Sequence, residues 1–185
     1  RVWVLTILAE IATRMGRMEI AEAHFKEALS LDIRDTYLLG AFSDFLLDQN
    51  RPSEVIELLQ SEVRADGLVL RKALAKKMMN APDLSRHIDI LRARFEASRR
   101  RADSRHLREE AIFTLKLLNQ PKKALELSLL NWTVQKEPLD ARILLESAVV
   151  GANEIKLVQP VLRWLKETKI EDVVLTRLAR KWGGI

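Results

Sequence analysis

Five short turn motifs, distributed along the whole chain, are the sequence feature that most limits how it can fold. Each motif begins with Gly or Asn, which tolerate the left-handed backbone conformation found where helices end. In three of them a proline stands two residues later, where it cannot continue the first helix but suits the first turn of the next. Each motif therefore predicts a tight joint between two helices. The motifs are Gly16-Arg17-Met18, Asn50-Arg51-Pro52, Asn80-Ala81-Pro82, Asn119-Gln120-Pro121 and Asn153-Glu154-Ile155.

The spacing of these joints indicates an internal repeat. The mean interval between successive joints is about 34 residues, with a shorter interval before Asn80 and a longer one before Asn119. Between the joints, apolar residues recur every three or four positions, as helices that bury one face require. No stretch shows the sustained alternation of a strand, and no Asn-Gly hairpin turn occurs. The sequence therefore predicts an all-α fold of five helix pairs.

The residues around the first joint resemble the tetratricopeptide repeat (TPR) family, whose period is about 34 residues with two helices per unit. Leu8–Ala12 provides the small residue of the first helix, while Ala21, Phe25 and Ala28 fill the alanine and aromatic positions of the second. The resemblance covers about the first 70 residues in motif and most of the chain in period. Because the chain starts inside a helical pattern without a capping residue, we expect it to be a fragment of a larger bacterial TPR protein.

This resemblance implies a fold and a domain organisation. We expect a right-handed α-solenoid of about five TPR-like helix pairs, forming one domain over residues 1–185. The expected units cover residues 2–35, 36–65, 66–104, 105–138 and 139–170. An amphipathic helix within residues 171–183 is expected to cap the last apolar face, as the end of a solenoid requires. The third unit breaks the period, and its second helix is expected to begin near Asp83 and run long.

The resemblance also implies a function, since TPR solenoids bind a peptide or helix of a partner in a concave groove lined by the first helix of each pair. The expected function is a non-catalytic protein–protein interaction scaffold. Thr6, Glu10 and Ala41 replace the Lys and Asn residues that grip a carboxylate in chaperone-binding TPR domains, so that subclass is disfavoured. Alignment on the joints gives the candidate groove residues Trp3, Thr6, Glu10, Thr13, Arg14, Tyr37, Asp44, Asp48, Leu70, Leu74, Lys77, His106, Glu109, Phe113 and Lys116.

The net charge of +5 comes from one segment of the chain. Residues 92–108 hold seven arginines against two acids, so the remainder of the chain is neutral. The segment is either a solvated helix end whose arginines pair with neighbouring acids, or a patch that binds an acidic protein surface, nucleic acid or anionic lipid. No aromatic residue follows Phe95 within it, which weakens base stacking. The arginines are Arg92, Arg94, Arg99, Arg100, Arg101, Arg105 and Arg108.

The sequence offers no constellation for catalysis, a metal or a cofactor. The chain has no Cys, which excludes disulfides, thiol nucleophiles and iron–sulfur clusters and is compatible with either cytoplasm or periplasm. Its three histidines form no H-x-x-x-H pair, and no glycine-rich phosphate loop or G-x-S-x-G motif occurs. No apolar run is long enough for a transmembrane helix. Besides the scaffold, two alternatives stay open: a solenoid that binds nucleic acid through residues 92–108, and an architectural segment that packs against its own chain.

Overall fold

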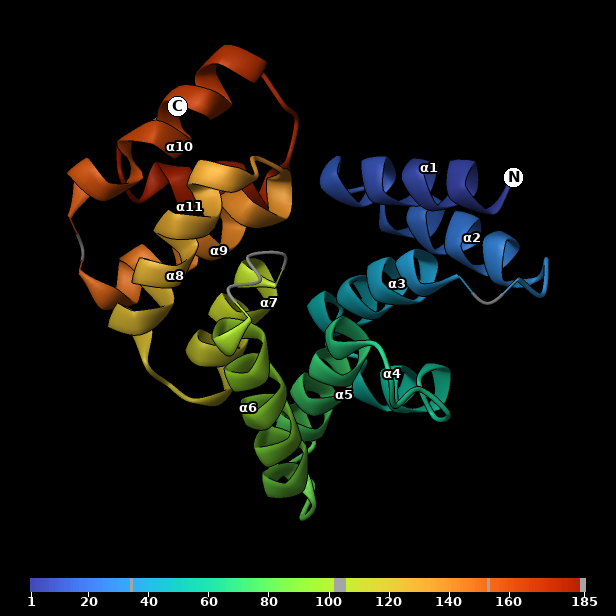
Figure 1. Cartoon of the computed structure of the whole chain (residues 1–185). Helices are drawn as coiled ribbons and strands as arrows, with labels where there is room; N and C mark the ends of the chain where they lie inside the picture. Colours follow the sequence, from blue (N-terminus) through green and yellow to red (C-terminus); the bar gives the residue numbers. More distant parts are fainter. Residues whose placement is uncertain (34, 102–105, 153, 184–185) are drawn as a thin grey trace. The chain divides into compact units, whose positions relative to one another are not determined.

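The described part of the chain is all-helical. The structure is a computed structural model that describes residues 1–33, 35–101, 106–152 and 154–183. Over these residues it contains eleven α-helices and one π-helical turn, and no strand (Figure 1). The helices fall into two compact units, Arg1–Ala93 and Arg94–Ile185. None of the described helices is both long and apolar enough to cross a membrane.

The first unit contains five complete helices and the start of a sixth. Its helices are α1 (Val2–Arg14), α2 (Met18–Leu29), α3 (Thr36–Asp48), α4 (Pro52–Leu58), α5 (Asp66–Met78) and the first part of α6 (Leu84–Arg100). Contacts join α1 with α2 and α3, and join α3 with α4 and α5. An aromatic cluster lies at the centre of its core, where Phe25 of α2 stacks on Phe42 and packs against Phe45 of α3. The expected helical stripes of α2 and α3 are therefore faces that this unit buries, as are Leu5, Ala9 and Ala12 of the stripe expected on α1, whereas Leu8 of that stripe is 42% exposed.

Four of the five predicted joints have the backbone conformation that their residues favour. The φ angle is 76° at Gly16, 57° at Asn50, 52° at Asn80 and 54° at Asn119, all in the left-handed region. The fifth joint begins at residue 153, which lies outside the described residues. The amide that follows each described joint residue turns back to a carbonyl of the preceding helix, as when Arg51 N donates to Leu46 O at 2.9 Å. Gly and Asn therefore end these helices for the expected physical reason.

Proline begins the next helix at two of the three predicted positions. Pro52 starts α4 and Pro121 starts α8. Pro82 does not lie in the first turn of α6, so that part of the prediction was wrong, whereas the expected start of the helix near Asp83 agrees with its start at Leu84. Pro82 and Asp83 instead form a turn, closed by a hydrogen bond of 3.2 Å from Leu84 N to Ala81 O, and the helix begins directly after it. From there α6 runs for 17 residues, so the long helix that was expected in this region is present.

The second unit contains the remaining helices and a separate core. They are the last part of α6, then α7 (Leu107–Ile112), the π-helical turn η1 (Phe113–Leu117), α8 (Pro121–Val134), α9 (Pro138–Gly151), α10 (Ile155–Thr168) and α11 (Val173–Arg180). Helix α9 contacts α7, α8, α10 and α11, so it is the central helix of this unit. The helix expected near the C-terminus is present as α11, and the Asp172 side chain caps it by accepting hydrogen bonds of 2.9 Å from Val174 N and Leu175 N.

Candidate functional site

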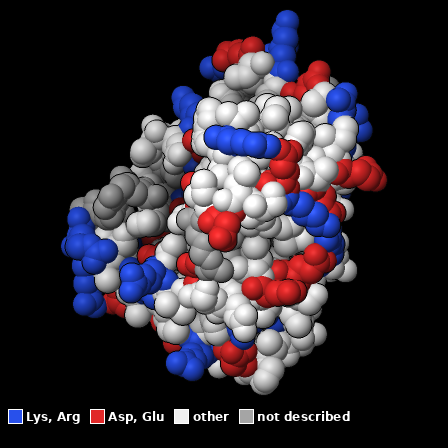
Figure 2. Space-filling view, turned by 90° about the vertical axis from the view of Figure 1, so that its right-hand side faces the viewer, with Lys and Arg blue, Asp and Glu red and all other residues white. Residues whose placement is uncertain are grey.

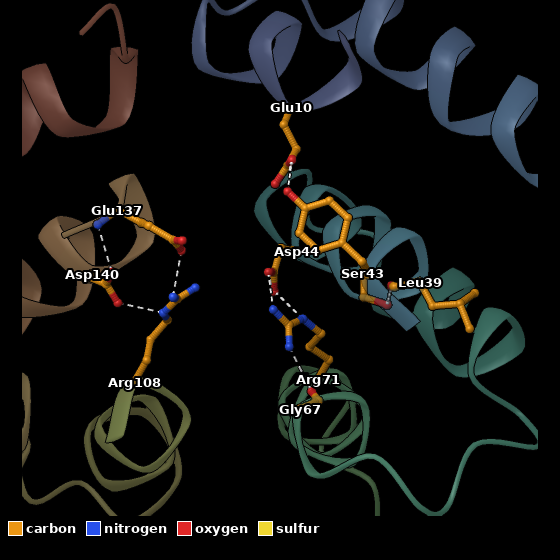
Figure 3. A network of polar contacts seen from close by, with 10 residues as sticks. Glu10, Leu39, Ser43, Asp44, Gly67, Arg71, Arg108, Glu137 and Asp140 are labelled. Carbon is orange, nitrogen blue, oxygen red and sulfur yellow. Dashed lines mark hydrogen bonds and ion pairs between the residues drawn. The ribbon is translucent and has the colours of Figure 1, made fainter. Parts of the chain in front are cut away.

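Polar side chains join α1 to α3 and α3 to α5 in the first unit. Tyr37 of α3 donates a hydrogen bond from its hydroxyl to the Glu10 carboxylate of α1. Arg71 of α5 donates from Nε and Nη2 to the two carboxylate oxygens of Asp44 on α3, at 2.8 and 2.5 Å (Figure 3). Glu10 and Asp44 are counterparts in the repeat, but Tyr37 and Arg71 are not, because the joints that follow α3 and α5 are only 30 residues apart. Each of the two acids therefore receives a polar side chain of the next helix, from a different position on that helix.

These contacts fix neighbouring helices against each other. The Arg71 side chain is only 15% exposed and holds Asp44 with two charge-assisted bonds, while its Nη1 donates to the Gly67 carbonyl at 2.9 Å. A planar guanidinium that donates both to a carboxylate and to a backbone carbonyl leaves little conformational freedom to Arg71 or Asp44. The face of α1, α3 and α5 that carries these residues is consequently pre-organised.

Two exposed aromatic side chains lie on this face. Trp3 of α1 is 65% exposed and Tyr37 of α3 is 48% exposed, although both are large and apolar. They are one repeat period apart, and each precedes an acid, Glu10 or Asp44, by seven residues. Seven residues are about two helical turns, so each aromatic residue shares a face of its helix with the acid. We call Trp3, Glu10, Tyr37 and Asp44 the first-helix face.

The remaining groove candidates of the first unit are divided between surface and core. Lys77 and Asp48 are exposed, and Thr13, Arg14 and Leu74 are partly buried. Thr6 and Leu70 are buried, at 0% and 1% exposure, so predicting them as groove residues was wrong.

In the second unit the candidates lie on α7 and η1. His106 and Glu109 are partly buried, and Lys116 forms an ion pair of 2.5 Å with Glu146 of α9. Phe113 is buried at 2% exposure and packs against Phe95 with ring centroids 5.3 Å apart, so its prediction as a groove residue was wrong. The cause is η1, because a π-helical turn accommodates about one extra residue and shifts the register that was counted back from Asn119.

A buried polar cluster links α7, α8 and α9. The Asp140 carboxylate, with no exposed side-chain surface, accepts bonds from Arg108 Nε at 2.6 Å, Asn131 Nδ2 at 2.7 Å and the Glu137 backbone N–H at 2.8 Å. Arg108 also donates to Glu137 Oε2 at 2.7 Å (Figure 3). Burial disfavours the charged guanidinium, but the carboxylates of Asp140, Glu109 and Glu137 outweigh that effect and raise the pKa of Arg108. The cluster is fully satisfied and serves the packing of these helices.

The basic segment is largely neutralised by acids of its own unit or helix. Arg92 pairs with Asp89 at 2.7 Å, Arg100 with Glu96 at 2.6 Å, Arg99 with the buried Glu110, and Arg108 with the cluster above. Arg94 is partly buried and Arg101 is exposed, while Arg105 lies outside the described residues. In the view of Figure 2, basic and acidic side chains are interspersed. The pairs match the interpretation of this segment as a solvated helix end.

No group of three or more His, Asp or Glu residues that could hold a metal ion occurs in residues 1–33, 35–101, 106–152 and 154–183. A hollow of about 300 Å³ lies between α8 and α10, next to a T-shaped contact of Trp132 with Trp164 whose centroids are 5.5 Å apart. Trp132 is buried at 6% exposure, and Trp164 is partly buried. The other residues that line the hollow are Lys136, Pro160, Arg163 and Glu167.

Sequence reasoning missed several residues that organise the candidate face. Arg71 stands 34 residues after Tyr37, but the joints that follow α3 and α5 are 30 residues apart, so alignment on the joints does not identify it as a partner of Asp44. Asp140 and Glu146 gave no signal either, because their partners lie in a unit where η1 interrupts the register. Known protein families, curated proteins and solved structures were each compared with the chain, and none of them matches it.

Proposed function

We propose that this chain is a non-catalytic scaffold that binds a peptide or helix of a partner protein on the first-helix face. In this proposal the helices form a right-handed, TPR-like α-solenoid in which α1, α3 and α5 are the first helices of successive pairs. The face would be the concave surface of that solenoid, as the resemblance of the sequence implies.

The observation that carries the proposal is the pair of exposed aromatic residues, Trp3 and Tyr37, one period apart on a rigid polar frame. Tryptophan and tyrosine are the residues most enriched at the centres of protein interfaces, where each buries a large area at little cost in side-chain entropy. Because neighbouring helices are held by Glu10–Tyr37 and Asp44–Arg71, their spacing is fixed before a partner arrives. Pre-organisation of this kind lowers the entropic cost of binding.

Affinity capture with matched variants tests the proposal. The chain is immobilised, exposed to extract from its native cell and analysed for bound proteins by quantitative mass spectrometry. The Trp3→Ala/Tyr37→Ala variant should lose a protein that wild type retains. The control, Leu130→Ala/Val134→Ala, removes two apolar side chains of α8 that are 54% and 64% exposed, and should retain that protein. Equal capture by all three chains would contradict the proposal.

A further inference from the structure

The hollow between α8 and α10 lies in the second unit, apart from the first-helix face, and we call it the tryptophan hollow. Its volume of about 300 Å³ lies at the lower end of the range found for small-molecule sites. Because a water molecule takes about 30 Å³ in the liquid, the hollow has room for a ligand of roughly ten non-hydrogen atoms. It is lined by Trp132 of α8, by Lys136 directly after that helix, and by Pro160, Arg163, Trp164 and Glu167 on one face of α10.

Two indole rings form the apolar wall of the tryptophan hollow. Trp132 belongs to the core cluster of the second unit, and Trp164 packs against the same cluster. Their ring centroids are 5.5 Å apart and their planes stand at 88° to each other. Since the core holds both rings, they are already in place when a ligand arrives, and this lowers the entropic cost of binding.

Pro160 adds a rigid apolar ring to the lining at a position where helix formation does not favour proline. It lies in the interior of α10, not in its first turn. Proline has no N–H, so the helix loses the hydrogen bond that residue 160 would otherwise donate to the Lys156 carbonyl. Local helix formation therefore does not explain this proline, whereas a place in the wall of a binding hollow does.

Three charged side chains of the lining have no ionic partner. Lys136, Arg163 and Glu167 are exposed, and none of them forms an ion pair with a residue in the described part of the chain. Other cations of the second unit do find acids, as Arg108 and Lys116 show. The tryptophan hollow thus combines apolar walls with two available cations and one acid, a local net charge of +1.

This combination favours an anion that carries a flat apolar body. Perpendicular aromatic rings also occur in sites for quaternary ammonium ligands, but two cations beside the rings oppose such a ligand. A doubly charged phosphate would lie next to the Glu167 carboxylate, whereas a singly charged carboxylate matches the net charge of +1. The guanidinium of Arg163 is in addition suited to a carboxylate, to which it can donate two parallel hydrogen bonds.

We propose that the tryptophan hollow binds an organic monocarboxylate. Its flat apolar body lies against Trp132 and Trp164, and its carboxylate is held by Lys136 and Arg163. A free small acid and the C-terminal end of a peptide both carry this chemistry. The proposal does not depend on the function proposed for the first-helix face, because it concerns the other unit of the chain.

An NMR titration tests the proposal at the tryptophans themselves. The complete chain, labelled with a nitrogen isotope, is titrated with phenylacetate, and its indole N–H signals are assigned with Trp→Phe variants. The signals of Trp132 and Trp164 should shift, with a Kd in the millimolar range expected for so small a ligand, while the signal of Trp3 in the first unit should stay unchanged. Phenylacetamide has the same shape without the charge and should bind about fivefold or more weakly.

Matched charge variants identify the side chains that hold the carboxylate. Lys136→Gln and Arg163→Gln should each weaken phenylacetate binding about fivefold or more, and Glu167→Gln should strengthen it. The controls Lys156→Gln and Arg177→Gln remove exposed cations of α10 and α11 that do not line the tryptophan hollow, and they should leave Kd unchanged. All five positions are exposed, so the fold should survive each substitution, as circular dichroism will check.

Two further probes determine the source and the class of the ligand. N-acetylphenylalanine presents its carboxylate as a peptide end does, so tighter binding of this probe than of phenylacetate indicates a peptide C-terminus, and the reverse order indicates a free acid. Both orders support the site. Tighter binding of phenyl phosphate than of either carboxylate would overturn the proposal, because the ligand would then be a phosphate.

Three other results would overturn the proposal. They are unmoved signals of Trp132 and Trp164, an equal Kd for phenylacetate and phenylacetamide, and a loss of affinity in Lys156→Gln as large as that in Arg163→Gln. If the cell makes a longer form of this protein, that form must bind phenylacetate too, and its failure to do so would mean that its own residues fill the tryptophan hollow.

Discussion

Replacing Asp140 with Ala should destabilise the second unit more than any surface substitution. The Asp140 side chain has no exposed surface, and it is the acceptor for three groups: the Arg108 guanidinium, the Asn131 amide and the Glu137 backbone N–H. Removing it leaves a guanidinium that is only 15% exposed, with Glu137 as its remaining hydrogen-bonded acid; the Glu137 side chain is 54% exposed, and Glu109 acts on Arg108 only through its charge. Removing one partner of a buried ion pair costs about 3 to 5 kcal/mol. We expect a loss in that range for Asp140→Ala.

Urea unfolding followed by tryptophan fluorescence measures this loss of unfolding free energy in the second unit. Trp132 and Trp182 are buried in the second unit, and Trp3 is largely exposed in the first, so the change in emission reports mainly on the second unit. For a unit of this size the free energy of unfolding falls by about 1 to 1.5 kcal/mol per molar urea. A loss of about 3 kcal/mol therefore lowers the midpoint by about 2 to 3 M urea.

A double variant separates the loss of the ion pair from a general loss of packing. Asp140→Leu combined with Arg108→Met removes both charges and keeps apolar volume, which is often close to neutral for a buried pair. The double variant should therefore be more stable than Asp140→Ala, although Asn131 and the Glu137 N–H lose an acceptor in both. A midpoint shift below about 0.5 M for Asp140→Ala, or a double variant no more stable than that single one, would refute the reasoning.

Two further predictions concern backbone proximity and pH. A Cβ on Gly151 would lie 2.8 Å from the Pro121 carbonyl oxygen, whereas a Cβ on Gly40 would lie 3.6 Å from Arg71, which is an ordinary contact distance. Gly151→Ala should therefore lower the free energy of unfolding by about 1 to 3 kcal/mol, and Gly40→Ala should not lower it. Urea unfolding of both variants measures the difference. Equal losses of unfolding free energy in Gly151→Ala and Gly40→Ala would contradict this prediction. Hydrogen bonds from Arg51 and Lys26 lower the pKa of Glu22 from 4.5 to about 2, so the stabilisation by this carboxylate is complete above pH 4.5 and is lost as the pH falls towards 2. Arg51→Gln should raise the Glu22 pKa towards 4.5 in an NMR titration, and an unchanged pKa would contradict the assignment of its cause.

The helices could be predicted from the sequence where local chemistry decides the structure. Gly16, Asn50, Asn80 and Asn119 end helices because they adopt positive φ, and that preference belongs to the residues themselves. The apolar stripes of α1, α2 and α3 were equally visible, since burial on one face of a helix leaves a three- and four-residue period. The recurrence of Trp3 and Glu10 as Tyr37 and Asp44 was also visible, because both pairs are separated by the same interval in the sequence.

The errors have physical causes that single residues do not reveal. Phe113 was assigned to the groove because the π-helical turn η1 cannot be recognised from its sequence, and every register counted across it shifts. Pro82 was expected in the first turn of α6, but a proline is equally compatible with the turn that precedes a helix. The acids that neutralise the basic segment come partly from distant positions, as with Arg99 and Glu110, and charge counting along the chain does not identify such pairs.

The exposed aromatic residues of α1 and α3 are the side chains that should hold the partner. Once a partner segment has been captured, its affinity for wild type and for Trp3→Ala/Tyr37→Ala can be compared by isothermal titration calorimetry. Truncation of an aromatic residue at the centre of an interface costs about 2 kcal/mol or more, which corresponds to a roughly 30-fold weaker Kd. We expect at least that loss for the double variant and no change for Leu130→Ala/Val134→Ala. An unchanged Kd for the double variant would contradict the proposal that the first-helix face is the binding surface.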